Sequence, residues 1–144
     1  MRQLIEYIYE SESKKYIDAF LVYEDQVLIL RRANYMRKFK SLWGVVGGSI
    51  ENKDKDSKSA AIREIKEETG ITLTFNEERT MKKIDTITHE DNSTSDIWVV
   101  KLETKPEIKI SREHSKYEWF NEESKMDKKW MPHIFQLIQK ILDK

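Results

Sequence analysis

The sequence predicts an α/β (α+β) fold, because short strand-like segments occupy much of the chain and two helix-like segments accompany them. The chain has 144 residues, the usual length of one domain, and residues 1–144 contain no linker that would divide two domains. Hydrophobic residues make up 38% of the sequence, a share that suits a packed core rather than a disordered chain. We therefore expect a single folded domain.

The first third of the chain predicts strands. Tyr16–Tyr23 and Val27–Arg32 are rich in aromatic and branched residues and flank a short polar turn, so we expect a hairpin. A strand within residues 1–15 is left open. A basic loop at 33–41 precedes residues 42–50 (LWGVVGGSI), which predict a short strand and a turn. All four glycines of the chain lie at or after position 44 and no later than 70, which indicates unusual backbone geometry there.

A helix is predicted from about Ser57 to Thr69. Asp56 or Ser57 supplies a side chain that can accept a hydrogen bond from a free amide of the first turn. Gly70 is a natural stop, because glycine adopts the left-handed conformation that ends many helices.

The second half predicts further strands and a last helix. Residues 71–75 alternate and indicate a strand, and polar residues 77–79 indicate a turn. The later strands are expected at 81–88, 95–103 and 116–120, and a helix with apolar residues at helical spacing is expected from about 130 to 142.

Composition excludes several classes of protein. Lys and Arg total 26, as do Asp and Glu, so the chain has no net charge to form a broad nucleic-acid-binding face. The lack of cysteine excludes disulfides, thiolate metal sites and cysteine nucleophiles, and suits a reducing cytoplasm. No apolar run approaches the roughly 20 residues of a membrane span, and no signal-peptide core follows the N-terminus. We expect a cytoplasmic protein.

Three glutamates gather on one face of the predicted 57–69 helix. Glu64, Glu67 and Glu68 are spaced three and four residues apart, so their carboxylates form a cluster that repels itself. A hard divalent cation with oxygen ligands, such as Mg²⁺ or Mn²⁺, would relieve that repulsion. The glycine-rich segment just before the helix could bring backbone groups to the same place. A merely solvated acidic face is the alternative from the carboxylates alone.

The segment 48–71 resembles the signature box of the Nudix hydrolases, G-x5-E-x7-R-E-U-x-E-E-x-G-U, where U is a bulky aliphatic residue. The half at Arg63–Ile71 (REIKEETGI) matches every specified position. Trp43–Gly48 is similar to the family's W-x-x-P-G-G lead-in, and Leu28–Arg32 is similar to its strand that ends in arginines. Glu113–Phe120 is similar to the family's closing segment before the last helix. The resemblance implies a Nudix-type fold, a mixed β-sheet sandwiched between helices.

The first half of the box departs from the pattern. The stretch from Gly48 to Arg63 is one residue longer than the family's, and the expected central glutamate is missing. Counting forward places Asp54 at that position and counting back places Lys55 there. That glutamate mostly supports the loop, so Asp54 is a candidate substitute. Val46 stands where proline is usual.

The resemblance also implies roles for individual residues. Glu64, Glu67 and Glu68 would be metal ligands or the base, with the backbone carbonyl of Gly47 or Gly48 completing the shell. Arg63 would orient a glutamate through an ion pair. The remaining candidates are Glu113 as a further ligand or base, and Arg32, Arg37 and Trp43 as substrate contacts.

Several other aromatic and histidine side chains could either contact the substrate or have only a structural role. Tyr35 and Phe39 flank the glycine segment and could stack on a base or simply pack. His89, His114 and His133 show no ligand spacing, which argues against a histidine metal site, although His114 could touch substrate.

The implied activity is hydrolysis of a diphosphate linkage in a nucleoside diphosphate joined to another group, with Mg²⁺ (Mn²⁺ as an alternative) as cofactor. Residues 85–87 lack the proline or tyrosine that marks ADP-ribose and dinucleoside-polyphosphate subfamilies, which favours a nucleoside-triphosphate pyrophosphatase. The alternatives are a catalytically weak nucleotide-binding or regulatory protein on the same fold, and an acidic scaffold without a ligand. The expected partner is a small-molecule nucleotide, bound by a monomer or homodimer.

Overall fold

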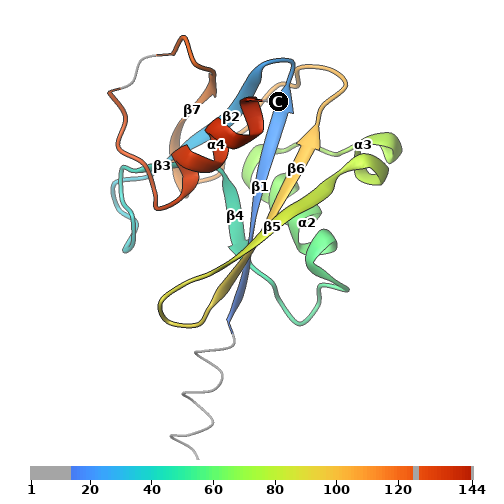
Figure 1. Ribbon diagram of the computed structural model, residues 1–144, viewed down its shortest axis with the longest axis horizontal. Coiled ribbons are helices and arrows are strands. Elements are labelled where there is room, and N and C mark those ends of the chain that lie inside the picture. The colour runs from blue at the N-terminus through green and yellow to red at the C-terminus, as the bar shows by residue number, and fades with distance from the viewer. Residues whose placement is uncertain (1–13, 125–126, 144) are drawn as a thin grey trace, which may run out of the picture.

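A computed structural model describes residues 14–124 and 127–143 (Figure 1). The possible strand within 1–15 falls almost entirely outside the described residues. In chain order the elements are β1 (Lys15–Tyr23), β2 (Gln26–Arg32), β3 (Trp43–Gly44), β4 (Val46–Ser49), α2 (Ser57–Thr69), α3 (Phe75–Thr80), β5 (Lys82–Thr88), β6 (Thr94–Lys101), β7 (His114–Phe120) and α4 (Ile134–Leu142). None of the described helices is long and apolar enough to cross a membrane.

The strands form one mixed sheet around β1. The strand order is β3-β2-β1-β6-β5, with β4 also paired to β1 and β7 to β2. β1 and β6 are parallel, and the other pairs are antiparallel. The predicted hairpin of β1 and β2 is confirmed, although the two strands pair only next to their turn, at Val22 and Tyr23. The earlier part of β1 pairs with β4 instead, which brings Gly47 and Gly48 beside Asp18 and Ile17.

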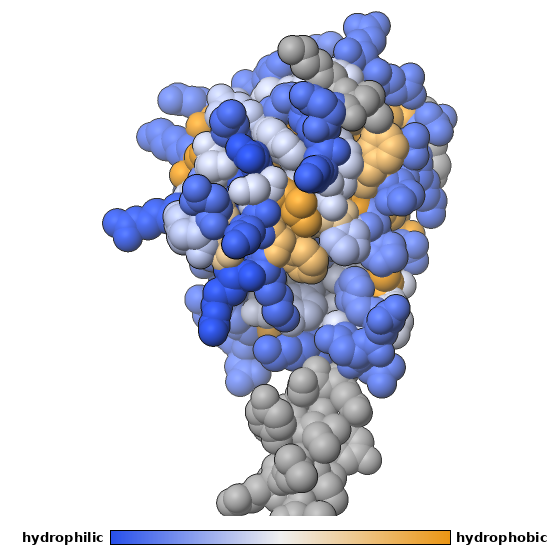
Figure 2. All heavy atoms as spheres, turned by 90° about the vertical axis from the view of Figure 1, so that its left-hand side faces the viewer, coloured by the Kyte–Doolittle hydropathy of each residue, from blue (hydrophilic) through white to orange (hydrophobic). Residues whose placement is uncertain are grey.

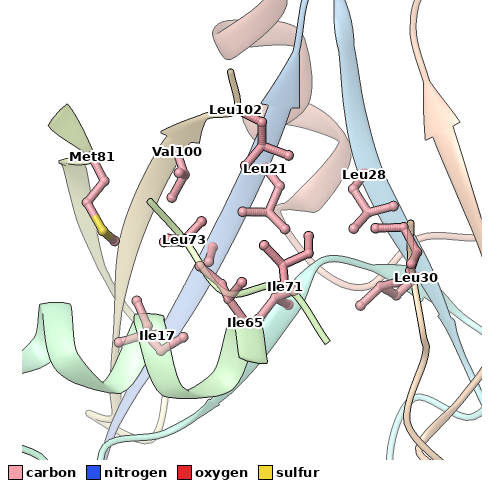
Figure 3. Close-up of a cluster of buried hydrophobic side chains, with 14 of the residues drawn as sticks. Ile17, Leu21, Leu28, Leu30, Ile65, Ile71, Leu73, Met81, Val100 and Leu102 are labelled. Atoms are coloured by element: carbon pink, nitrogen blue, oxygen red, sulfur yellow. The ribbon is translucent and has the colours of Figure 1, made fainter. Parts of the chain in front are cut away.

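Helices cover both faces of the sheet, as the fold class predicts. On one face α2 contributes Ala60, Ala61 and Ile65 to a buried cluster with residues of β1, β2 and β6 (Figure 3). On the other face α4 contributes Ile134, Leu137 and Ile138 to a second cluster. Alternate residues of β1 point to opposite faces, because successive side chains of a strand point in opposite directions. Burial of apolar surface on both faces fixes the register of β1.

The bounds of α2 agree with its sequence signals. The side chain of Asp56 accepts a hydrogen bond of 2.8 Å from the backbone N–H of Ser59 and so caps the first turn. Gly70 has a φ of 77°, the left-handed conformation that favours glycine, and its N–H bonds to the carbonyl of Lys66. The helix that carries the glutamates is therefore fixed at both ends.

Two expectations for the segment after α2 are wrong. Residues 71–74 are extended and bury Ile71 and Leu73, but they pair with no strand in the described part of the chain. Residues 77–79 belong to α3 rather than to a turn. The sequence contains the reason: Thr74 and Glu77 form a capping box, in which each side chain accepts a hydrogen bond from the other's backbone amide.

The last helix and several strand ends also differ from the prediction. α4 begins at Ile134, because Trp130 pairs with Trp43 in an isolated bridge and Pro132 lies just before the first turn. β6 ends two residues before position 103, and β7 begins two residues before position 116. Figure 2 shows the face on the β3 and β7 side, where mostly hydrophilic side chains surround small apolar patches.

Candidate active site

Glu68 and Glu64 of α2 lie directly against the glycine segment of β4. The carboxylate of Glu68 is buried, and its Oε2 accepts a hydrogen bond of 3.3 Å from the backbone N–H of Gly47. A Cβ added at Gly48 would lie 1.6 Å from Oε2 of Glu64. The lack of a side chain at position 48 therefore makes room for the Glu64 carboxylate, which a Cβ there would displace. The predicted convergence of the glycine segment and the helix carboxylates is present in the structure.

Burial and mutual repulsion make these two carboxyl groups hard to ionise. Burial is the largest cause that raises the pKa of Glu68, followed by the charges of Glu64 and Glu113. Burial also raises the pKa of Glu64, and neighbouring Glu67 and Glu113 add to the effect. Although the side chain of Glu113 is exposed, its charge thus helps to raise the pKa of both Glu64 and Glu68. A cation placed among these groups would favour their charged forms.

His114 lies on the other side of Glu68. Its Nε2 is 3.5 Å from Oε1 of Glu68, and its side chain is buried at the start of β7. Burial, with a smaller effect of Arg32, lowers the pKa of His114 to about 4, so the ring is neutral at pH 7. Nδ1 of this ring is buried without a hydrogen-bond partner among the described residues. Sequence spacing gave no signal for this contact beyond an open possibility that His114 touches substrate.

Arg63 braces the loop between β4 and α2. Its guanidinium donates two hydrogen bonds to Asp54, from Nε to Oδ1 at 2.9 Å and from Nη2 to Oδ2 at 2.8 Å. Nη2 also bonds to the carbonyl of Ser49 at 3.1 Å. The hydrogen bonds from Arg63 lower the pKa of Asp54 to about 2. Asp54, and not the exposed Lys55, therefore takes the supporting position that the lengthened box left ambiguous.

Glu67 lies on the solvent side of the cluster, next to Glu64 and paired with Arg63. Its side chain is 52% exposed, and its Oε2 is 3.1 Å from Nη1 of Arg63. Among the described residues no group of three or more acidic or histidine side chains is already arranged to hold a metal ion. The donors nevertheless suit a hard cation, because Glu64 and Glu68 are crowded carboxylates beside a backbone segment that lacks side chains. Magnesium commonly binds through few carboxylates, with water and substrate phosphate completing its shell.

A cavity of about 800 Å³ opens beside Glu68. Its walls come from β1, β4, the loop between β5 and β6, the 38–39 part of the basic loop and residues 131–134. Among the predicted substrate contacts Arg32 lines this cavity, and Arg37 and Trp43 do not. The ring of Trp43 packs with the α4-side cluster, and Nζ of Lys128 lies 5.3 Å from its centroid. Of the aromatic alternatives, Phe39 lines the cavity, while Tyr35 lines a smaller one of about 270 Å³.

Asp18 is a cavity residue that sequence reasoning missed. It lies in β1 opposite Gly47, where a Cβ would be 2.7 Å from its Oδ1. Burial raises the pKa of Asp18 to about 7. The available signal was the acidic residue within the otherwise apolar run YIDAFLVY, since a carboxylate inside a core strand is rare without a role.

Comparisons with known proteins agree with this arrangement. The family model of the NUDIX domain matches residues 13–141. The NUDIX domain of Shewanella oneidensis NrtR, solved with ADP ribose, superposes with a TM-score of 0.73 at 19% identity, over 91% of this chain and 87% of that one. The MutT protein of Methanosarcina mazei gives 0.67 at 25% identity, over 91% and 93%.

A third solved structure is longer than this chain. The chain covers 51% of a MutT/nudix family protein from Enterococcus faecalis, with 84% of its own length aligned, a TM-score of 0.64 and 18% identity. No curated protein matches the sequence.

Proposed function

We propose, because the chain belongs to the Nudix family of hydrolases, that it hydrolyses a diphosphate linkage in a small nucleotide and that nucleoside triphosphates are its substrate class. The main support for this proposal is the position of Glu68. Its carboxylate is buried, accepts a hydrogen bond from the amide of Gly47 and lies at the edge of a cavity of about 800 Å³. A charged group in such a position costs free energy unless a ligand compensates it.

The chain's own residues supply the donors for a divalent cation, which we propose to be Mg²⁺. Glu64 and Glu68, with a backbone carbonyl of Gly47 or Gly48, would hold it, and Glu67 could join them by leaving Arg63. When bound, the ion would neutralise phosphate charge and lower the pKa of a water molecule. Arg63 positions the helix against the loop through Asp54.

The cavity offers a place for the rest of the substrate. Arg32 lines it and carries a positive charge toward the same space as Glu68 and His114, which suits a phosphate. Glu113 contributes negative charge next to Glu64 and Glu68, as a further ligand or base would. Arg37 and Trp43 lie outside the cavity lining, so we do not assign them to the substrate.

A catalytically weak nucleotide-binding protein remains the second proposal. The lengthened first half of the box favours it, because a displaced loop would disturb the metal-binding helix. The two hydrogen bonds between Arg63 and Asp54 oppose it, because they restore the support that the missing glutamate would provide.

A panel of nucleotides assayed with Mg²⁺ or Mn²⁺, with released phosphate or pyrophosphate as the readout, separates the two proposals. We expect turnover of at least one nucleoside triphosphate that EDTA abolishes and that Glu68→Gln reduces strongly. Glu78→Gln on α3 is the matched control and is expected to leave turnover unchanged. Nucleotide binding without turnover would support the weak-binding protein, and neither binding nor turnover would contradict both proposals.

A further inference from the structure

Asp18 interrupts an apolar face of the central strand. Phe20 and Val22, the next residues of β1 on its side of the sheet, belong to the cluster under α4. Ile97, the β6 residue paired with Asp18, belongs to the same cluster. The alternation of β1 therefore calls for an apolar side chain at position 18, and a carboxylate stands there instead. Asp18 lies at the edge of the cluster that α4 covers and lines the adjacent cavity. Residues 131–134 line the same cavity.

The carboxylate of Asp18 has no partner within the protein. Across residues 14–124 and 127–143 it makes no hydrogen bond and no ion pair, and burial alone accounts for its perturbed acidity. The Asp18 side chain is only half-buried, so its carboxylate is accessible from the cavity that it lines. A second polar group of the same cavity is buried without a partner, because Nδ1 of His114 makes no hydrogen bond within the described residues while its residue is 7% exposed. Native proteins satisfy most buried polar atoms, so this exception, beside an accessible carboxylate without a protein partner, indicates that a ligand binds here.

We infer that Asp18 is a specificity-determining residue of the proposed hydrolase and that its carboxylate accepts hydrogen bonds from the N–H groups of a guanine base. This inference rests on the proposed function, because it concerns the nucleotide that occupies the cavity beside Glu68. It goes further in naming the base and the residue that selects it.

The chemistry of the cavity favours a base over the other parts of a nucleotide at this position. A carboxylate repels phosphate, so the phosphates belong near Arg32 and a cation rather than at Asp18. The walls include the rings of Phe39, His89 and His133, which suit the flat faces of a heterocycle. His89 is held in place by a bond of 2.8 Å between its Nε2 and Oγ of Ser95.

The pattern of donors identifies guanine among the common bases. Its ring N1–H and its 2-amino group point in the same direction, and a carboxylate can accept both through its two oxygens. Hypoxanthine lacks the amino group, so one carboxylate oxygen would lose its donor. Adenine presents an acceptor nitrogen beside its amino group, which would face the carboxylate unfavourably. We therefore expect affinity to fall from guanine to hypoxanthine and adenine.

The test compares dissociation constants for the α,β-imido analogues of GTP, ITP and ATP, measured by calorimetry with Mg²⁺ at pH 8.5. That pH keeps the carboxylate of Asp18 ionised. Wild-type protein is expected to prefer the guanine analogue over the other two by at least about tenfold. Asp18→Asn, which nearly conserves shape, is expected to remove most of that preference, and Asp25→Asn in the exposed β1–β2 turn is expected to keep it.

Two results would overturn the inference: wild-type protein with no preference for guanine, or Asp18→Asn protein that folds and retains the preference. The 2′-deoxy analogue of the guanine ligand addresses the sugar. Equal affinity for both sugars is expected, and a tenfold loss that Asp18→Asn removes would assign Asp18 to the ribose instead. Binding needs no turnover, so a guanine preference in a protein that hydrolyses no nucleotide would contradict only the proposed function.

Discussion

Two charged regions meet at the Gly47–Gly48 segment, and they differ in how their charges are partnered. On the loop side, Arg63 binds Asp54 through two hydrogen bonds and also lies 3.4 Å from Glu51. On the cavity side, Glu68 is buried beside a neutral histidine and other acidic groups, and Asp18 has no partner in the described chain. Asp54 and Glu51 in the loop region face an opposite charge, whereas Glu68 on the cavity side has only the amide of Gly47 and a neutral histidine beside it.

The difference shows in the acidity of the carboxyl groups. The hydrogen bonds from Arg63 lower the pKa of Asp54 to about 2, whereas burial and repulsion raise the pKa of Glu64 and Glu68. The paired charges of Arg63 and Asp54 fix the position of the loop. The crowded carboxyl groups of Glu64 and Glu68 are costly to ionise, and a bound cation would lower that cost. We therefore propose that the loop region supports the site and that the cavity region binds the ligands.

The largest expected effect comes from the cavity side. Glu68→Gln keeps the size and helix propensity of the side chain but removes a charge that would hold a cation. We expect kcat on the best nucleotide substrate to fall by at least about 100-fold, or roughly 2.7 kcal/mol of barrier. Without metal, the melting temperature should stay the same or rise slightly, because an unfavourable buried charge is gone.

Glu67→Gln is expected to reduce kcat by a similar factor, and it also removes a partner of Arg63 at 3.1 Å. Steady-state turnover and a thermal melt in EDTA, measured on the same preparations, check both variants. A folded Glu68→Gln protein that retains half of the wild-type activity would contradict the assignment of α2 as the metal-binding helix.

On the loop side, removal of Asp54 should act on stability. Asp54→Ala leaves the guanidinium of Arg63 without its two-bond partner, and the Asp54 side chain is only 4% exposed. We expect the free energy of unfolding to fall by about 2 kcal/mol. Lys55→Ala, one residue along the same loop, should change it by less than about 0.5 kcal/mol. Urea unfolding checks the pair, and equal effects of the two variants would show that Asp54 does not brace the loop.

The two regions should respond to pH in opposite directions. Because the folded-state pKa of Asp54 is lowered from 3.8 to about 2, its stabilisation is present above about pH 4 and is lost as pH falls toward 2. Because the folded-state pKa values of Glu64 and Glu68 are raised from 4.5, their ionisation opposes folding increasingly as pH rises above that value.

Urea unfolding in EDTA between pH 2 and 9 tests both signs. The deficit of Asp54→Asn relative to wild type should shrink below pH 4. The decline in wild-type stability above pH 5 should be smaller in Glu68→Gln. If the free energy of unfolding changed with pH in the same way for wild type and both variants, the predicted opposite responses of the two regions would be contradicted.

The smallest expected effect is the response of the melting temperature to metal. A cation that binds only the folded protein with a Kd of about 1 mM would add about 1.4 kcal/mol at 10 mM. For a domain of this size that is a shift of about 3–5 °C. Melts with Mg²⁺, compared with sodium chloride at matched ionic strength, check this. No shift at all would argue against a cation site in the absence of nucleotide.

The parts of the molecule that local chemistry specifies could be predicted from the sequence. The capping residue Asp56 and the stop at Gly70 predicted the observed bounds of α2, and richness in aromatic and branched residues around a polar turn located β1 and β2. The approach of Glu64 and Glu68 to the glycine segment was expected because that segment comes shortly before the helix. These features depend on residues close to one another in the chain.

The features that were missed depend on tertiary contacts. Position 18 is brought to Gly47 by the pairing of β1 with β4, and His114 is brought to Glu68 by the pairing of β7 with β2. The choice between Asp54 and Lys55 depended on where Arg63 reaches, which spacing alone left open. The capping box at Thr74 was present in the sequence, but the alternation of Ile71 and Leu73 favoured a strand over the helix that follows.

The central claim is that Glu64 and Glu68, beside the Gly47–Gly48 segment, bind a divalent cation. Electron paramagnetic resonance of free Mn²⁺, titrated with protein in the absence of nucleotide, measures this binding directly. We predict that wild-type protein and Lys55→Ala remove Mn²⁺ from solution equally, and that Glu68→Gln binds it at least about tenfold more weakly. Wild-type and Glu68→Gln proteins that bind Mn²⁺ with the same affinity would contradict the claim.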